Sequence, residues 1–138
     1  MTRRAHDSRR ILAKQLLPQL LEGDDPRLAV LRMQLAASSI SIKPNKDCGF
    51  YAHFSVPSEV EKVHPPDFCG GSAKIKVETL SAGAGCLLHV KNGVLSHLDV
   101  YTYYESWEYP QIFEEVSVVE PVIPGEHIWC RGFGKSSA

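Results

Sequence analysis

The 138-residue sequence lacks the short motifs that most directly mark an activity. Its four cysteines form no C-x-x-C pair, so the spacing of a zinc ribbon or of a thioredoxin-like redox site is absent. Neither glycine-rich loop of nucleotide-binding proteins occurs after an expected strand, and there is no G-x-S-x-G nucleophile elbow. The chain also lacks an alternating strand-helix-strand pattern, which argues against a doubly wound nucleotide-binding fold.

Charge and hydropathy argue against two further classes of partner. The formal net charge is −1, whereas a dedicated nucleic-acid binder usually carries a strong basic excess. No run of apolar residues approaches the ~18 needed to span a membrane. Residues 8–14 resemble the start of a twin-arginine export signal, but Lys14 and Pro18 interrupt the uncharged apolar stretch that should follow. We therefore expect a soluble cytoplasmic protein with reduced thiols and with no nucleic-acid or membrane partner.

The N-terminal part of the chain predicts two helices. Apolar residues near helical spacing mark the first one: Ile11, Leu12, Leu16 and Leu20. Asp25 followed by Pro26 is a start signal for a second helix over 26–37, because a short acid caps free amides and proline suits the first helical position. An apolar stripe runs along it at i, i+3 and i+7, made of Leu28, Leu31 and Leu35. Gln34 is placed off that stripe.

From Ser38 onward the apolar period changes to two, which is typical of strands with one buried face. The expected strands are a hairpin of 38–42 and 50–56, then 73–77, 86–90, 95–101 and 116–119. Asn92-Gly93 supplies the two positive-φ residues of a type I′ hairpin turn. We expect a long loop at 57–71 and irregular ends at 1–6 and 125–138. The sequence predicts a single domain, 1–138, with an α+β fold whose N-terminal helices pack on an antiparallel, meander-type sheet.

His89 and His97 flank the tight turn, which suggests a metal site. The alternation of side chains along the two strands argues against it. With a two-residue turn, His89 faces Ser96 and His97 faces Leu88, so the imidazoles lie on opposite sides of the sheet. A β-bulge would reverse that arrangement. We predict no metal and no cofactor.

His97 and Asp99 share one side of their strand, with Cα atoms about 6.6 Å apart. The carboxylate could therefore orient the imidazole as a general base. Cys86 would face Asp99 across the hairpin, which would add a thiol to the pair. The alternative is a structural hydrogen bond at the sheet surface, and no residue is assigned as catalytic.

Aromatic residues gather late in the chain: Tyr101, Tyr103, Tyr104, Trp107, Tyr109 and Phe113. Tyrosine and tryptophan are favoured at interfaces because they combine a large apolar area with a polar tip. These side chains either pack in the core and its rim or form a binding face. Residues 105–126 hold six glutamates and no Lys or Arg, whereas residues 1–16 hold five basic groups. These segments could pair within one chain or between copies, which leaves a homo-oligomer open.

Three stretches of the sequence resemble a group of small uncharacterised bacterial proteins. They are LRMQL at 31–35, GFY at 49–51 leading to FSVP at 54–57, and GCLLHVKNGVLSHLDVYTY at 85–103 with Trp107 behind it. Similar hairpins, in which a glycine turn is followed by leucine, an acid and tyrosine, occur in some toxin-immunity proteins. The resemblance covers about 28–110. It implies an α+β domain with no known activity and does not support catalysis by His97 and Asp99.

Two functions from different classes remain. The first is a non-enzymatic bacterial cytoplasmic domain that binds a protein partner, as an immunity-like or accessory factor. Its expected contact residues are Tyr101, Tyr103, Trp107 and Tyr109. The second is a small-molecule-binding protein or weak hydrolase, with a pocket near His97 and Asp99 that the 57–71 loop closes.

Overall fold

The computed structural model describes residues 2–45, 49–77, 80–103, 106 and 115–124, and only the backbone of 2–8. Two helices come first, α1 (Thr2–Leu20) and α2 (Pro26–Ala37). The strands are β1 (Ser39–Pro44), β2 (Gly49–Ser55), β3 (Phe68–Gly70), β4 (Ser72–Val77), β5 (Leu80–Lys91), β6 (Val94–Thr102) and β7 (Glu115–Glu120). The expected α+β composition is therefore confirmed, and the bounds of α2 match the prediction.

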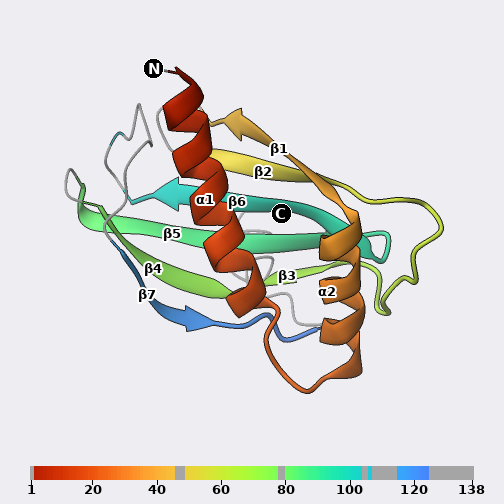
Figure 1. Cartoon of the computed structure of the whole chain (residues 1–138). Coiled ribbons are helices and arrows are strands. Elements are labelled where there is room, and N and C mark those ends of the chain that lie inside the picture. The colour runs from red at the N-terminus through yellow and green to blue at the C-terminus, as the bar shows by residue number, and fades with distance from the viewer. Residues whose placement is uncertain (1, 46–48, 78–79, 104–105, 107–114, 125–138) are drawn as a thin grey trace, which may run out of the picture.

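The strands form one antiparallel sheet in the order β1-β2-β6-β5-β4-β7, with β3 paired to β5 (Figure 1). The predicted hairpins β1–β2 and β5–β6 are both present. The sheet departs from the expected meander, in which each strand pairs with the next one along the chain. β3 pairs with β5, β4 pairs with β7, and β2 crosses over to pair with β6. This crossover brings β2 and β5 to the two sides of β6.

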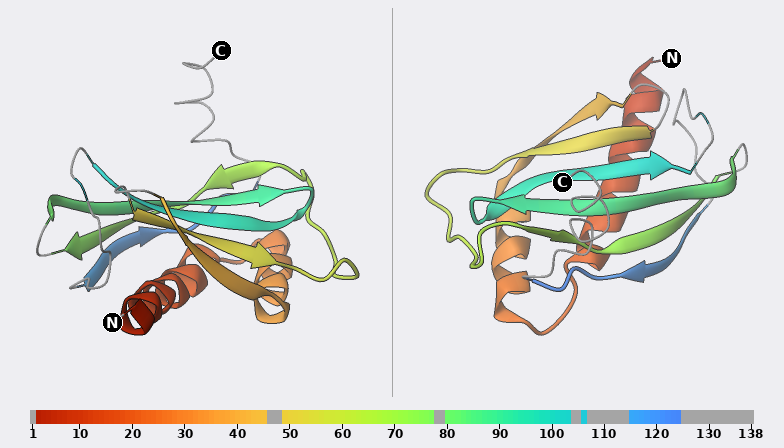
Figure 2. Two further views of the ribbon diagram at one scale, coloured as in Figure 1. Left: turned by 90° about the horizontal axis from the view of Figure 1, so that it is seen from above. Right: turned by 180° about the vertical axis from the view of Figure 1, so that it is seen from behind.

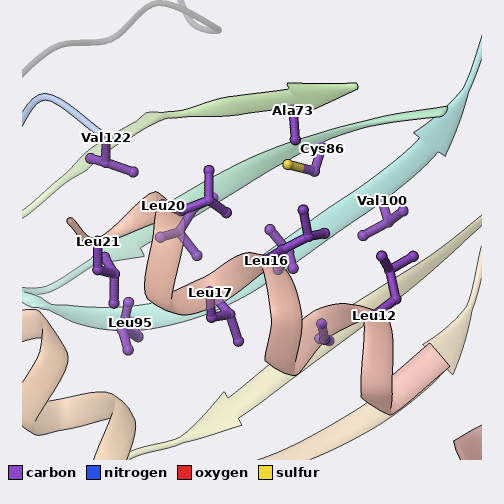
Figure 3. Close-up of a cluster of buried hydrophobic side chains, with 14 of the residues drawn as sticks. Leu12, Leu16, Leu17, Leu20, Leu21, Ala73, Cys86, Leu95, Val100 and Val122 are labelled. Atoms are coloured by element: carbon purple, nitrogen blue, oxygen red, sulfur yellow. The ribbon is translucent and has the colours of Figure 1, made fainter. Parts of the chain in front are cut away.

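Both helices lie on the same side of the sheet (Figures 1 and 2). Five side chains of α1, and Leu21 directly after it, are at most 1% exposed: Leu12, Ala13, Leu16, Leu17, Leu20 and Leu21. They belong to one core cluster with Cys86, Leu95 and Val100 of the sheet (Figure 3). Ile11 was expected on this face but is 57% exposed, because the buried positions recur at i+4 from Leu12 and turn Ile11 outward.

Gln34 is a buried polar residue, contrary to the prediction that it lies off the apolar stripe of α2. It is 1% exposed, because it follows Leu31 by three positions and so shares its face. Its side-chain amide donates to the Glu61 and Gly93 carbonyl oxygens at 2.8 and 3.0 Å. Its Oε1 accepts from the Leu95 amide at 2.9 Å. Gln34 thus joins α2 to the β5–β6 turn.

The long loop before β3 is fastened to the same turn. The Val63 amide donates to Gly93 O, the Gly93 amide donates to Pro66 O, and the Asn92 amide donates to Asp67 Oδ1. Asn92 and Gly93 have φ of 55° and 81°, as the predicted type I′ turn requires. The expected loop over 57–71 is shorter than predicted, since β3 occupies Phe68–Gly70.

Residues 1–6 were expected to be irregular, but α1 begins at Thr2 within that segment. Residues 125–138 were also expected to be irregular, and they lie outside the described residues. α1 continues past Pro18, and Arg32 Nη1 donates to the Leu21 carbonyl oxygen at its end. Neither described helix is long and apolar enough to cross a membrane.

Candidate functional site

The sheet side opposite the helices, seen from behind in Figure 2, carries the candidate site. Side chains alternate between the two sides of a strand, so the residues between buried core positions project away from the helices. One of them is Leu87 of β5, which is buried and pairs with Asp99. The aromatic and ionisable ones are Tyr51 and His53 on β2, His89 on β5, and His97, Asp99 and Tyr101 on β6, with Tyr103 directly after β6. We call this set the histidine–tyrosine face. Its members are half-buried, except for Tyr103, which is 38% exposed.

Three imidazoles form a row across adjacent strands of this face. His53 pairs in register with His97, and His97 pairs with His89. The His89 and His97 rings are stacked, with centroids 4.2 Å apart and planes 13° apart. The His53 and His97 centroids are 5.4 Å apart, and the Tyr51 ring meets His97 edge-on at 5.8 Å. Cys69 of β3 is the register partner of His89, so a thiol-bearing residue extends the row.

The stacked pair corrects the expectation that His89 and His97 lie on opposite sides of the sheet. The register shifts between His89 and Val90: Val90 pairs with Leu95, but His89 pairs with His97. Ser96 is the extra residue of this bulge, and an extra residue reverses the parity of everything beyond it. The Ser96 Oγ lies 3.1 Å from His97 Nδ1.

The same bulge separates Cys86 from Asp99, which were expected to face each other. Asp99 pairs with Tyr51 and Leu87, whereas Cys86 pairs with Val100. Cys86 lies on the helix side of the sheet, among the core side chains (Figure 3). Burial raises the pKa of its thiol to about 12, so it stays protonated near neutral pH. No Cys-His-Asp cluster is assembled there.

His97 and Asp99 do share one side of β6, as predicted, and burial shifts their pKa values in opposite directions. The pKa of Asp99 is raised to about 6 by desolvation. Its Oδ1 is buried and has no hydrogen-bond partner within the described residues. The pKa of His97 is lowered to about 4, first by desolvation and then by His89, His53 and Lys91. Desolvation, followed by Lys91, also lowers the pKa of His89. His89 and His97 are therefore neutral at pH 7 and each offers one donor and one acceptor.

The tyrosine end of the face is built over a glycine. The Tyr101 and Tyr103 rings meet at a centroid distance of 5.5 Å and an angle of 84°. A Cβ on Gly85 would overlap the Tyr103 hydroxyl and come within 3.2 Å of the Tyr101 ring, so glycine leaves the space that both rings use. Of the predicted contact residues, Tyr101 and Tyr103 are thus together, while Trp107 and Tyr109 lie outside the described residues.

The face does not present a metal site as it stands. Within the described part of the chain, no group of three or more His, Cys, Asp or Glu side chains is arranged to hold a metal ion. The stack explains this for His89 and His97, because imidazole lone pairs lie in the ring planes and nearly parallel planes do not converge on one ion.

Three cavities are formed by described residues, and Tyr103 of the face lines one of them, the cavity beside β4 and β5. One of about 420 Å³ lies between α1 and β1, one of about 500 Å³ lies beside β4 and β5, and one of about 550 Å³ lies near Val122. Neither His97 nor Asp99 lines any of these three. Comparisons of the chain with protein-family models, curated proteins and solved structures find no match.

Sequence reasoning missed two members of the face, Tyr51 and His53. The signal was available, since Phe50 and Ala52 are buried and their neighbours must point the other way. The row of imidazoles could not be predicted from the sequence in the same way. It depends on the crossover that places β2 beside β6 and on the bulge at Ser96, and no local pattern in the sequence marks either.

Proposed function

We propose that this protein is a non-enzymatic binding domain and that the histidine–tyrosine face is its contact surface for a protein partner. The observation that carries the proposal is the gathering of imidazole and phenol rings from three adjacent strands on one side of the sheet. Such rings bury a large area with few rotatable bonds, and each keeps a polar edge for hydrogen bonding.

The electrostatics of the face favour a particular kind of partner. Its stacked histidines are neutral at pH 7, and Asp99 adds an acceptor oxygen without a partner among the described residues. A surface of this kind suits a partner that presents aromatic or aliphatic groups together with hydrogen-bond donors. An immunity-like or accessory role would use the face in this way.

The arrangement gives little support to catalysis. Cys86 points into the core and its pKa is raised, so it supplies no thiolate beside His97. The Ser96 Oγ does lie 3.1 Å from His97 Nδ1, but its activation would require that imidazole to act as a base. His97 itself is a weak base, because its pKa is lowered to about 4.

The test is quantitative affinity capture with matched variants. The tagged protein, its Tyr101→Ala/Tyr103→Ala variant and a Met33→Ala control are each incubated with lysate of the source organism. Met33 is a suitable control because it is 66% exposed on α2, away from the face. We expect capture of one stoichiometric partner. The amount captured should fall at least tenfold with the tyrosine variant and should be unchanged with Met33→Ala. Equal capture by all three, with the variants folded by circular dichroism, would contradict the proposal.

A second candidate function is favoured by one observation: the Oδ1 of Asp99 is buried and has no hydrogen-bond partner among the described residues. Buried polar atoms are almost always hydrogen-bonded, so this oxygen suits a donor group of a bound small molecule. On that hypothesis the protein binds a small ligand or acts as a weak hydrolase near His97 and Asp99. A ligand screen by NMR distinguishes the two, because hits whose binding is abolished by Asp99→Asn would favour the small-molecule function.

A further inference from the structure

A groove of about 420 Å³ lies between α1 and the beginning of β1, on the helix side of the sheet. Its volume falls within the range of about 300–1,000 Å³ that is usual for small-molecule sites. Its apolar part is formed by Leu17, Pro18, Leu35 and Ile40, and its cations are Arg10 and Lys14. Leu35 and Ile40 are only partly buried, so they offer apolar surface to a molecule in the groove.

The two cations stand together without a counter-ion among the described residues. They are four residues apart on α1, where like charges repel. Arg10 Nη1 donates to the Ile40 carbonyl oxygen at 2.8 Å, which holds the guanidinium at the strand and occupies one of its five N–H donors. Within the described part of the chain, Lys14 has neither hydrogen bond nor ion pair, and no residue lining the groove is acidic.

We propose that this groove binds a small amphipathic anion, a carboxylate with a short aliphatic tail. The carboxylate would accept hydrogen bonds from Lys14 and from the remaining N–H groups of Arg10, which suit its planar geometry. The tail would cover the apolar surface of Leu35 and Ile40 and remove it from water. This site is separate from the histidine–tyrosine face, and the proposal does not depend on the function proposed for that face.

Calorimetric titration of the whole chain with octanoate tests the site. Lys14→Glu reverses the charge that has no partner among the described residues, and Lys14→Met removes it. Lys76→Glu is the matched control, since Lys76 is an equally exposed lysine that lines the separate cavity beside β4 and β5. A parallel titration with 1-octanol, which has a similar tail but no charge, measures the contribution of the carboxylate. Thermal unfolding confirms that each variant is folded.

We expect saturable binding of one octanoate per chain, weakened at least tenfold by Lys14→Glu and by an intermediate factor by Lys14→Met. Lys76→Glu should change the affinity less than twofold, octanol should bind at least fivefold more weakly, and added salt should reduce octanoate binding. Equal weakening by Lys14→Glu and Lys76→Glu would overturn the assignment, because it would indicate non-specific attraction to positive charge. Loss with Lys76→Glu alone would move the site to the other cavity. Absence of saturable binding would also overturn it.

Discussion

The two sides of the central strands carry different chemistry although their residues alternate along the same backbone. Toward the helices, Ala52, Leu88, Leu98 and Val100 are completely buried and belong to one apolar core. On the other side, their neighbours are the half-buried histidines, tyrosines and aspartate of the candidate face, together with the buried Leu87. The contrast indicates that the helix side of the sheet supplies the stability of the fold, which allows the other side to hold polar and ionisable groups.

Two adjacent residues of β5 give the largest expected difference between the sides. Leu88→Ala should lower the free energy of unfolding by about 2–5 kcal/mol, because it leaves a cavity in a packed core. His89→Ala should cost less than about 1 kcal/mol, since it removes a half-buried ring from the other side. Urea unfolding of both variants measures this difference. Equal losses would contradict the assignment of stability to one side.

Each side of the sheet also faces one unusual polar group, and their hydrogen bonding differs. The Gln34 side chain makes three hydrogen bonds in the core, whereas the Oδ1 of Asp99 has no partner in the described part of the chain. Gln34→Met should lower the free energy of unfolding by about 2–3 kcal/mol, because it leaves the buried Leu95 amide without an acceptor. The control is Gln19→Met, because the Gln19 side-chain amide donates to the Gln15 carbonyl oxygen at an exposed position of α1. This variant should change the free energy of unfolding by less than about 0.5 kcal/mol.

Asp99→Asn should raise the free energy of unfolding, whereas Gln34→Met should lower it. The folded-state pKa of Asp99 is raised to about 6 from 3.8, so the folded protein holds this proton more tightly than the unfolded chain. The stabilisation that comes from protonated Asp99 is therefore present below about pH 4 and is lost as the pH rises through 6. With allowance for solvent screening, we expect Asp99→Asn to stabilise the protein by about 1 kcal/mol at pH 8 and by less at pH 4.5. A uniform loss at both pH values would show that the carboxylate is paired.

His97→Gln should reveal the complementary pH dependence. The folded-state pKa of His97 is lowered to about 4 from 6.5, so its stabilising contribution is complete above 6.5 and is lost as the pH falls toward 4. The groups that contact it or shift its pKa are His53, His89, Lys91, Tyr51 and the Ser96 hydroxyl, and Asp99 lies two residues along β6. Wild-type protein should lose about 1 kcal/mol more than the variant between pH 7 and 4, after discounting for exposure. Parallel stability curves would contradict this.

Local patterns in the sequence were sufficient for elements whose signals are short-range. Asp25-Pro26 marked the start of α2, Asn92-Gly93 marked the hairpin turn, and alternation marked β1, β2 and β4. The misses were non-local. The burial of Gln34 depends on acceptors and donors from Glu61, Gly93 and Leu95, and the histidine row depends on an unmarked bulge. Of the candidate site, the position of His97 and Asp99 on one side of β6 was foreseen, but their neighbours from β2 and β5 were not.

The relative position of His89 and His97 is the most direct test, because the Ser96 bulge decides whether His89 of β5 lies on the same side of the sheet as the β2 and β6 residues of the histidine–tyrosine face. A nuclear Overhauser spectrum of the protein with assigned ring protons measures it. We expect a direct cross-peak between protons of the His89 and His97 rings, because the ring centroids are 4.2 Å apart. Cross-peaks from His97 to the Leu88 methyl groups, with none to His89, would show that the hairpin has no bulge and would contradict the account.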